Sequence, residues 1–367
     1  MSRCKLEEFI TYEQPAKYIV DSDQYDDSFD IPVLTAGKSF ILGYTDETNN
    51  IFDNLPVIIF DDFTTSVQFV DFPFKVKSSA MKLLKNTEQA DIKYCYYLLK
   101  FLQHTPENHK RQWLSATSQN IVELPTIEEQ KNIVRKLDKI LEVIDNQNKQ
   151  LELLDEAIKA RFVEMFGDPV DNPMNWKKRR LKDIVTEDCT ISYGIVQTGE
   201  EQKEGIPVFR PVDIVNHTPK VEELKKTTEF ISDRYKKTLL KGHELLITVR
   251  ANIADTFIAD EEFMGCNVGR GIVPIRTQED IMRLEFLKCL IDNKHLNDIL
   301  KSKAKGITLI QLNMEDLRNV ELIIPPIDLQ IDYLKYSRLI DKSRSRIQKS
   351  LEASQELFDS LMQEYFG

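Results

Sequence analysis

The sequence predicts an α+β protein in which two similar mixed α/β domains are separated by two long antiparallel helices that form a coiled coil. Two observations predict this pseudo-twofold internal repeat. First, residues 125–167 match residues 325–367 without a gap, because both segments begin with Pro-x-Ile-x-x-Gln and end with Glu-x-Phe-Gly. Second, apolar residues recur every three or four positions along both segments. Self-similarity at a fixed offset is typical of a duplicated architecture.

The repeat sets the expected domain boundaries. We expect a first domain over residues 1–123, a first helix and linker over 124–173, a second domain over 174–323 and a second helix over 324–367. The two domains correspond more faintly than the helices, through Ile31-Pro32-Val33 and Ile206-Pro207-Val208, 175 residues apart. Each domain also contains a buried-strand candidate and an amphipathic helix candidate. These are residues 55–60 and 92–102 in the first domain, and residues 244–249 and 284–296 in the second.

The first long helix is expected from about Ile127 to Phe166, a length of about 60 Å at 1.5 Å per residue. Pro125 suits a helix start and Gly167 suits a helix end. Its apolar positions alternate in steps of four and three, which is the 3.5-residue repeat of a coiled-coil seam. Gln147 interrupts the seam with a polar side chain of the kind that can fix register. The seam positions of the second segment are Ile340, Arg344, Ile347, Leu351, Ser354, Phe358, Leu361 and Tyr365.

Neither long helix can bury its apolar stripe alone. We therefore expect the two to pack on each other and to hold the domains at opposite ends of a rigid rod. The alternative is that each helix packs separately on its own domain. A rod of this length suits a ligand with two separated sites, such as duplex DNA with half-sites about 34–36 Å apart for each helical turn between them.

The composition is ordinary for a globular chain, with 41% apolar and 30% charged residues. No apolar run is long enough to span a membrane and the first residues do not resemble a signal peptide, so we expect a cytoplasmic protein. The five cysteines are odd in number and lack C-x-x-C spacing, which predicts neither disulfides nor a zinc site. The net charge of −11 counts against simple DNA binding, unless a local basic surface and partner subunits supply the cations.

No catalytic, cofactor-binding or metal-binding motif is complete. Residues 36–39 (AGKS) imitate the end of a phosphate-binding loop, but the required first glycine is Pro32. Residues 172–174 (NPM) lack the second proline and the aromatic residue of an adenine methyltransferase motif. The histidines have no H-E-x-x-H spacing, and Asp61-Asp62 is expected to shape a loop rather than to bind a metal. We therefore predict no catalytic residue, no cofactor and no metal on this chain.

Several segments resemble a known family at this point. Residues 124–130 (LPTIEEQ) and 161–169 (RFVEMFGDP) resemble the conserved regions of type I restriction–modification specificity subunits. Residues 242–253 (GHELLITVRANI) and 267–272 (NVGRGI) resemble that family's target-recognition domains. Residues 31–44 (IPVLTAGKSFILGY) and 57–64 (VIIFDDFT) resemble a second variety of the same domain. The chain departs from the family at Thr126, where a second proline is common, and at Asp328-Leu329, which replace a Glu-Glu pair.

The resemblance implies a non-catalytic, sequence-specific DNA-recognition subunit. Each domain would read one half of a bipartite DNA target, and the helices would set the spacing and dock two methyltransferase subunits. Two restriction/translocase subunits would join them, and S-adenosylmethionine, ATP and Mg²⁺ would belong to these partners. The partner-binding residues implied are Pro125, Glu128, Glu129, Gln130, Arg161, Phe162, Phe166, Pro325, Gln330 and Phe366.

The DNA-contacting candidates are polar and basic residues at expected loops and strand ends, because these side chains read base edges and phosphates. In the first domain they are Thr35, Lys38, Ser39, Thr64, Thr65, Ser66, Lys75, Lys77, Lys110 and Arg111. In the second domain they are Gln197, Thr198, Arg210, Arg250, Asn252, Arg270, Lys303, Lys305, Thr308 and Gln311. The alternative for each is a surface ion pair or a solvated turn. The basic run of residues 177–182 (KKRRLK) is either a phosphate anchor or a solvated lead-in to a strand.

Two other functions stay open on the sequence. A DNA-modifying enzyme in its own right would need a cofactor site that the motifs above do not supply. A coiled-coil scaffold without a nucleic-acid role would agree with the acidic net charge.

Overall fold

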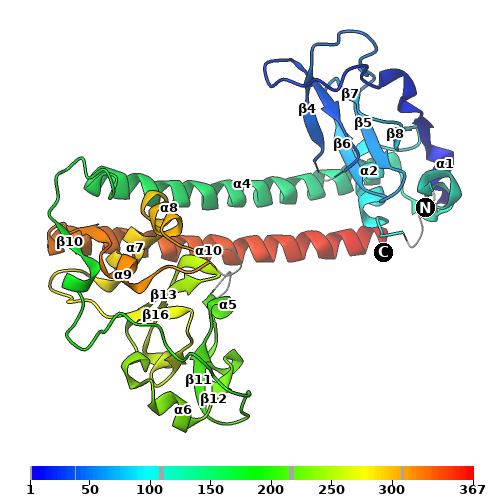
Figure 1. Ribbon diagram of the computed structural model, residues 1–367. Helices are drawn as coiled ribbons and strands as arrows, with labels where there is room; N and C mark the ends of the chain where they lie inside the picture. Colours follow the sequence, from blue (N-terminus) through cyan, green and yellow to red (C-terminus); the bar gives the residue numbers. More distant parts are fainter. Residues whose placement is uncertain (1, 38, 107–110, 215–218, 307–309) are drawn as a thin grey trace. The chain divides into compact units, whose positions relative to one another are not determined.

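The computed structural model describes residues 2–37, 39–106, 111–214, 219–306 and 310–367. Contacts between residues divide the chain into unit 1, Met1–Gln150 with Ile347–Gly367, and unit 2, Leu151–Arg346. Both divisions fall inside the long helices α4 (Ile127–Phe166) and α10 (Ile327–Phe366), which are each 40 residues long and uninterrupted (Figure 1). The expected bounds of the first long helix are confirmed.

Unit 1 is built on two sheets and a strand pair. Its elements before α4 are β1 (Ser2–Lys5), α1 (Leu6–Phe9), β2 (Ile10–Glu13), η1 (Pro15–Tyr18), β3 (Ile31–Leu34), β4 (Ile41–Thr45), β5 (Val57–Asp61), β6 (Val67–Val70), β7 (Lys75–Val76), β8 (Met81–Asn86), α2 (Ile92–Phe101), α3 (Gln112–Ser115), η2 (Thr117–Gln119) and β9 (Ile121–Leu124). One sheet has the antiparallel order β2-β8-β5-β6, and the other has the order β4-β3-β7 with β3 and β7 parallel. The strands β1 and β9 pair antiparallel.

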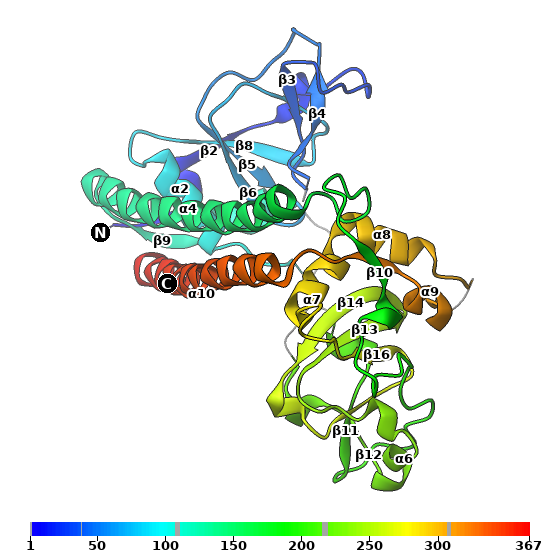
Figure 2. The ribbon, with the colours of Figure 1, turned by 90° about the vertical axis from the view of Figure 1, so that its left-hand side faces the viewer.

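Unit 2 repeats this plan. After the first long helix come β10 (Lys178–Arg180), η3 (Leu181–Asp183), β11 (Ile206–Phe209), α5 (Pro211–Ile214), η4 (Val221–Glu223), β12 (Lys226–Thr227), α6 (Glu229–Asp233), η5 (Lys236–Thr238), β13 (Glu244–Arg250), β14 (Asn252–Ala259), η6 (Glu261–Phe263), β15 (Asn267–Val268), β16 (Ile272–Ile275), α7 (Leu284–Asp292), α8 (Lys294–Ser302), α9 (Met314–Arg318) and β17 (Glu321–Ile323). The sheets have the orders β14-β13-β16 and β12-β11-β15, and β10 pairs with β17 (Figure 2).

The predicted internal repeat is confirmed at the level of strand order. The strands β5, β6 and β8 correspond to β13, β14 and β16, with the same antiparallel pairings. The strands β3, β4 and β7 correspond to β11, β12 and β15, again with one antiparallel and one parallel pairing. Two units of unlike sequence therefore share one scaffold.

One expected helix is in fact two. The periodicity predicted a single helix over residues 284–296, whereas α7 ends at Asp292 and α8 begins at Lys294. Asn293 separates them because its side-chain oxygen accepts hydrogen bonds from the backbone N–H groups of His295 and Leu296. Such a cap satisfies the free donors of a new helix start and competes with continuation of the preceding helix.

The long helices run antiparallel within each unit. In unit 1 the Gln147 amide donates to the Ser350 hydroxyl (2.8 Å), and the Lys136 ammonium lies 3.0 Å from the Tyr365 hydroxyl. In unit 2 Arg344 pairs with Asp155. Partner numbers fall along one helix as they rise along the other, as an antiparallel pair requires. The predicted seam is confirmed, with Gln147 at its polar interruption.

The far end of each long helix is anchored by aromatic side chains. Phe166, at the end of α4, packs in unit 2 against Phe286 and Tyr333, with ring centroids 4.8 and 5.6 Å away. Phe366, at the end of α10, packs in unit 1 against Tyr94 and Phe101, at 5.3 and 6.1 Å. The repeated Glu-x-Phe-Gly ending is therefore a packing motif. No helix in the described ranges is long and apolar enough to cross a membrane.

Candidate nucleic-acid interface

Three of the predicted arginines lie at the ends of neighbouring strands in unit 2. Arg250 is the last residue of β13, Arg270 follows β15, and Arg210 follows β11. Two backbone hydrogen bonds join these strand ends, from Val249 N–H to Gly271 C=O and from Gly269 N–H to Phe209 C=O, each 2.8 Å. The fold therefore brings together residues that lie up to 60 positions apart in the sequence (270 − 210).

The turn between β13 and β14 adds further candidates to the same edge. Ala251 occupies the left-handed region (φ +62°), which sets Arg250 and Asn252 on the two sides of a tight turn. The backbones of Arg250 and Gln311 form an isolated antiparallel β-bridge. Gln311 also exchanges two backbone hydrogen bonds of 2.9 Å with Lys305. The loop before α9 is thus held against the turn. Thr308 lies outside the described residues.

Among the residues that the structure describes, no carboxylate forms an ion pair with Arg250 or Arg270. Within the described ranges neither guanidinium forms an ion pair or a hydrogen bond. Both Nε atoms are buried without a partner, and the Arg270 guanidinium lies 5.9 Å from the centre of the Tyr193 ring. We name these two residues the arginine pair. A guanidinium held in this way presents a rigid fork of donors that matches guanine O6 and N7 or a phosphate.

Arg210 differs from the arginine pair. Its guanidinium donates two hydrogen bonds to the Asp213 carboxylate, and this interaction raises the pKa of Arg210. Arg210 and the half-buried Thr198 line one small cavity together with Lys225 and Lys226. The Thr198 backbone carbonyl accepts a hydrogen bond from the Thr227 hydroxyl (2.6 Å). Gln197, by contrast, is exposed. Arg210 therefore has an internal acidic partner, whereas the described part of the chain supplies none to the arginine pair.

The corresponding edge of unit 1 carries hydroxyl groups in place of guanidinium groups. The turn between β5 and β6 holds Thr64, Thr65 and Ser66. Thr65 is buried, and its hydroxyl bonds the backbone of His104, as a donor at 2.7 Å and as an acceptor at 3.0 Å. Thr65 therefore shapes the turn, while the exposed Thr64 and the half-buried Ser66 remain candidates.

Asp61 and Asp62 build this turn, as the sequence predicted. Asp61 accepts from the backbone N–H of Phe63 (2.8 Å). The backbone carbonyl of Asp62 accepts from Gln112 N–H (2.8 Å), and its carboxylate accepts from Trp113 N–H (2.9 Å). Asp62 also forms a fully buried ion pair with Lys82 (2.9 Å). These bonds place the exposed Arg111 beside the turn, as Gln311 is placed in unit 2; Lys110 lies outside the described residues.

The second group of candidates in unit 1 needs one correction. Lys75 is only 1% exposed, and its ammonium is ion-paired with Glu47 and bonded to the Asn49 carbonyl (3.1 Å). It is a core residue, and we withdraw it as a DNA contact. Lys77 is half-buried and ion-paired with Asp23, an interaction that raises its pKa. The Thr35 hydroxyl donates to the backbone carbonyl of the exposed Ser39 (2.8 Å), and Lys38 lies outside the described residues.

The repeated glutamines implied as partner contacts are buried inside their units. Gln130 accepts from Asp91 N–H (2.8 Å) and donates to the carbonyls of Pro125 (2.9 Å) and Gln89 (3.2 Å). Each glutamine joins the start of a long helix to the chain before α2 or α7. A buried amide that satisfies three backbone groups has no free atom for a partner, so we withdraw both glutamines as partner contacts.

Gln330 repeats this arrangement in unit 2. It accepts from Arg283 N–H (3.0 Å) and donates to the carbonyls of Pro325 (2.9 Å) and Ile281 (3.0 Å). The other buried residues of the implied partner surface are Pro125, Phe162, Phe166 and Pro325. We withdraw these four as well, because their side chains lie inside the units.

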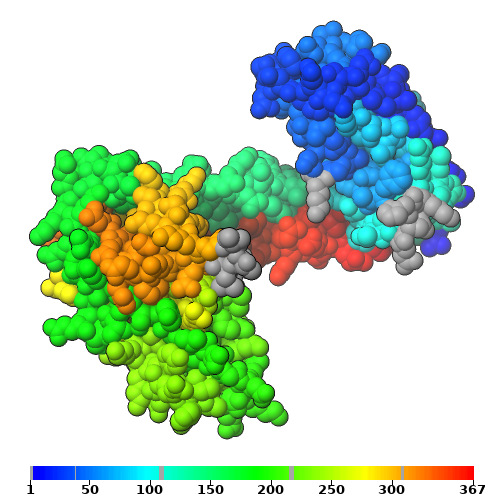
Figure 3. Space-filling model, viewed as in Figure 1, coloured from blue at the N-terminus to red at the C-terminus, as the bar shows by residue number. Residues whose placement is uncertain are grey.

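A smaller set of the implied partner residues is accessible. Glu128 and Glu129 are exposed, and Glu129 caps the start of α4 by accepting from Thr126 N–H (2.9 Å). Arg161 and Phe366 are half-buried. Figure 3 shows, in red, that part of α10 lies at the surface. The sequence reasoning missed the most exposed apolar residues of the two long helices, which lie outside the predicted seam. They are Val143, Leu153 and Val163 on α4, and Leu339 and Leu357 on α10, from 47% to 66% exposed. The sequence could have indicated these residues, because each is an apolar residue at a position outside the 3.5-residue repeat of the seam.

Comparisons with known proteins agree with this architecture. Residues 173–353 match the model of the type I restriction modification DNA specificity domain. The chain is 28% identical to the Escherichia coli type I restriction enzyme EcoR124I/EcoR124II specificity subunit, covering 96% of this chain and 91% of that protein. Its fold is similar to that of a type I restriction–modification S subunit from M. genitalium, with a TM-score of 0.63 and 13% identity, covering 100% of this chain and 96% of that one. A chain from a type I R-M system studied for complex assembly is similar too, with a TM-score of 0.60 and 16% identity, covering 100% and 97%.

Proposed function

Because this chain belongs to the type I restriction–modification specificity subunits, we propose that its two units read the two unlike halves of a bipartite DNA target. In this role the chain is the non-catalytic DNA-recognition subunit. The observation that carries the proposal is the duplicated edge. Both units place a strand–strand turn beside a loop, on the same strands, but unit 1 presents hydroxyl groups where unit 2 presents the arginine pair.

The proposed base-reading groups of unit 2 are Arg250, Arg270, Asn252 and Gln311. Arginine prefers guanine, and asparagine and glutamine prefer adenine, because their donors and acceptors match those base edges. In unit 1 we propose Thr64, Ser66 and Arg111, with Ser39 and Lys77 on the neighbouring β3–β7 surface. Four other candidates that are exposed or half-buried stay predictions: Gln197, Thr198, Lys303 and Lys305. Lys38, Lys110 and Thr308, which lie outside the described residues, also stay predictions.

The long helices are proposed to set the spacing between the half-sites and to bind the partner subunits. The exposed apolar residues of α4 and α10 support the binding role, because they offer apolar surface that a partner subunit can bury. We propose two methyltransferase subunits on this surface and two restriction/translocase subunits beyond them. S-adenosylmethionine, ATP and Mg²⁺ would be bound by those partners, and the complex would work in the cytoplasm, where the DNA is.

Methylome sequencing of the source cell tests the reading of DNA. We expect one bipartite adenine-methylated motif that disappears when this gene is deleted and returns with the wild-type gene. Restoring the gene as the R250A/R270A variant should change only one of the two half-words. The matched control is Arg234→Ala, which removes an exposed arginine at the end of α6 in the same unit. A motif that survives the deletion would exclude the proposal.

An insertion tests the spacing role separately. Seven residues added after Gln150 and seven after Arg346 preserve the seam and lengthen each helix by about 10 Å. At about 3.4 Å per base step, the gap between the half-words should grow by about three base pairs. The same insertion in one helix alone breaks the pairing of the seam and should abolish methylation. An unchanged gap in the doubly extended protein would rule out the spacing role.

A further inference from the structure

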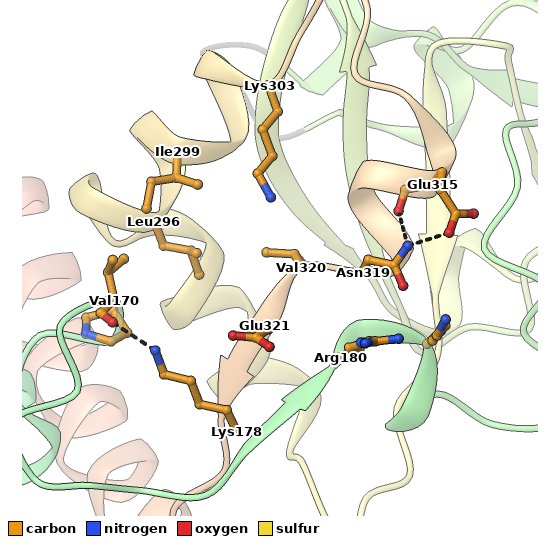
Figure 4. A pocket seen from close by; sticks show the side chains of 12 residues that line it. Val170, Lys178, Arg180, Leu296, Ile299, Lys303, Glu315, Asn319, Val320 and Glu321 are labelled. Atoms are coloured by element: carbon orange, nitrogen blue, oxygen red, sulfur yellow. Dashed lines mark hydrogen bonds between the residues drawn. The ribbon is translucent and has the colours of Figure 1, made fainter.

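A cationic cavity lies in unit 2 beside the strand pair β10–β17 (Figure 4). It has a volume of about 540 Å³, and none of its lining residues belongs to the edge that carries the arginine pair. Its walls come from the chain after α4, from β10 and η3, from α8, and from α9 and β17. The charged lining residues are Lys178, Arg180, Lys182, Lys303, Glu315 and Glu321.

The cavity has four cations, Lys178, Arg180, Lys182 and Lys303, and no described residue is an acidic partner of any of them. Within the described ranges none of them forms an ion pair, and only the Lys178 ammonium has a hydrogen bond, to the Val170 carbonyl (2.9 Å). Figure 4 shows Lys303 extending from the end of α8 toward the strand pair. Glu315 accepts from the Asn319 amide instead. With two acids and four bases, the lining has a formal charge of +2, in a chain whose net charge is −11.

The same strand pair in unit 1 shows that the scaffold does not require this charge. The strand β1 corresponds to β10 with an offset of 175 residues, so Arg3 and Lys5 stand where Lys178 and Arg180 stand. In unit 1 both cations are neutralised, Arg3 by Glu123 and Lys5 by Glu7, each at 3.6 Å.

The most direct difference is a reversal of charge at one position. Glu7, which neutralises Lys5, corresponds to Lys182 (182 − 175 = 7). Opposite Arg180 on the partner strand stands Glu321, yet the two side chains form no ion pair, although both lie in the described ranges. Unit 2 thus holds unpaired cations where unit 1 holds ion pairs.

We propose that this cavity binds a backbone phosphate of duplex DNA, without regard to base sequence, next to the half-site that unit 2 reads. This rests on the proposed function, since the duplex is the phosphate source. Lysine ammonium groups are compact point charges, and with Arg180 they can surround a phosphate oxygen from several sides. The cavity would fix the position of unit 2 on the duplex, while the arginine pair reads the bases.

The test measures the salt dependence of binding by the full-length chain to a duplex that lacks the target. Each phosphate contact that is lost lowers the slope of log K against log[salt] by about 0.9. We expect R180A/K182A to reduce the slope by about one and to weaken binding to target and non-target duplexes by the same factor. Lys303→Ala, on a different wall, should act in the same direction. The matched control is K177A/R179A, which removes two charges from the same segment outside the cavity lining.

A second measurement separates the two sources of phosphate. Calorimetric titration measures the binding of inorganic pyrophosphate to the wild-type chain and to R180A/K182A. We expect the two titrations to be the same, because the site takes the phosphates of a duplex and not free phosphates. If that variant lost pyrophosphate binding while its salt slope equalled that of K177A/R179A, the site would take free phosphates and the duplex assignment would fall. Equal slopes and equal titrations in all variants would overturn the site altogether. The ratio of the affinities for target and non-target duplexes is a separate measurement. If the wild-type chain showed no preference for the target, that result would count against the proposed function and not against the phosphate site.

Discussion

Unit 1 and unit 2 share a strand order and differ in what they do with their cations. Unit 1 pairs three of its lysines with acids: Lys75 with Glu47, Lys77 with Asp23 and the fully buried Lys82 with Asp62. Unit 2 leaves Arg250 and Arg270 without an acidic partner in the described ranges. One scaffold can therefore carry hydroxyl groups or guanidinium groups at its strand–strand turn, and the side chains of that turn decide which.

The largest expected effect concerns the ion pair that builds the unit 1 turn. Asp62→Ala leaves Lys82 buried and unpaired and removes an acceptor of Trp113 N–H, so unfolding should become easier by about 3–5 kcal/mol. Urea denaturation of the full chain, followed by circular dichroism, measures this. The exposed Asp71→Ala is the control. A loss below about 1 kcal/mol would mean that the turn does not depend on this pair.

The next effect should be equal in both units. Gln130→Ala and Gln330→Ala each leave backbone groups of a helix start and a neighbouring loop unsatisfied, at about 1–3 kcal/mol for each buried group. Denaturation midpoints should therefore fall by similar amounts in the two variants, and Gln150→Ala on the exposed face of α4 should change little. If only one of the two variants were strongly destabilised, the two glutamines would share the same hydrogen-bond geometry but would not contribute equally to the free energy of unfolding.

The third prediction compares the two edges directly. Arg250→Ala should lower the preference for the unit 2 half-word by about 1–3 kcal/mol, the usual value of a bidentate base contact. Thr64→Ala should lower the preference for the unit 1 half-word by about 0.5–1.5 kcal/mol, because a neutral hydrogen bond is weaker. Competition binding with substituted half-words, in complex with the methyltransferase subunits, measures both. Losses that fell on the wrong half-word would break the assignment of units to halves.

The smallest effect concerns the seam, which belongs to both units alike. The Gln147 amide donates to Ser350, but its carbonyl oxygen is buried without a partner. Gln147→Leu should therefore stabilise the chain by about 1 kcal/mol while weakening the preference for one register. Gln150→Leu, outside the seam, should not stabilise it. Thermal unfolding measures the change in stability. If Gln147→Leu destabilised the chain, the hydrogen bond from Gln147 to Ser350 would contribute more than the unsatisfied carbonyl oxygen costs.

The sequence alone predicted the repeat and the two long helices, and it named Arg210, Arg250 and Arg270 as separate candidates without showing that the fold brings them together. Those features depend on periodicity and on residue type, which a linear sequence displays. It could not predict the fate of Lys75 or Gln130, because their partners lie far away in the chain: Glu47 is 28 residues before Lys75, and Asp91 is 39 residues before Gln130. It also missed the break at Asn293, where a local cap overrides a continuous apolar stripe. Residue type indicated a polar role in each case, but only the fold shows which groups are already satisfied.

The division of both long helices between the units has a consequence for synthesis on the ribosome. The hydrophobic core of unit 1 includes Phe358 and Met362 from the last turns of α10, beside Tyr97 and Leu137. Residues 1–150 therefore emerge from the ribosome with part of their core exposed, and that core cannot close until α10 has been translated. A product that terminates before α10 would leave an apolar face of unit 1 open, so the folding of the first-made unit depends on a segment that is made about 200 residues later.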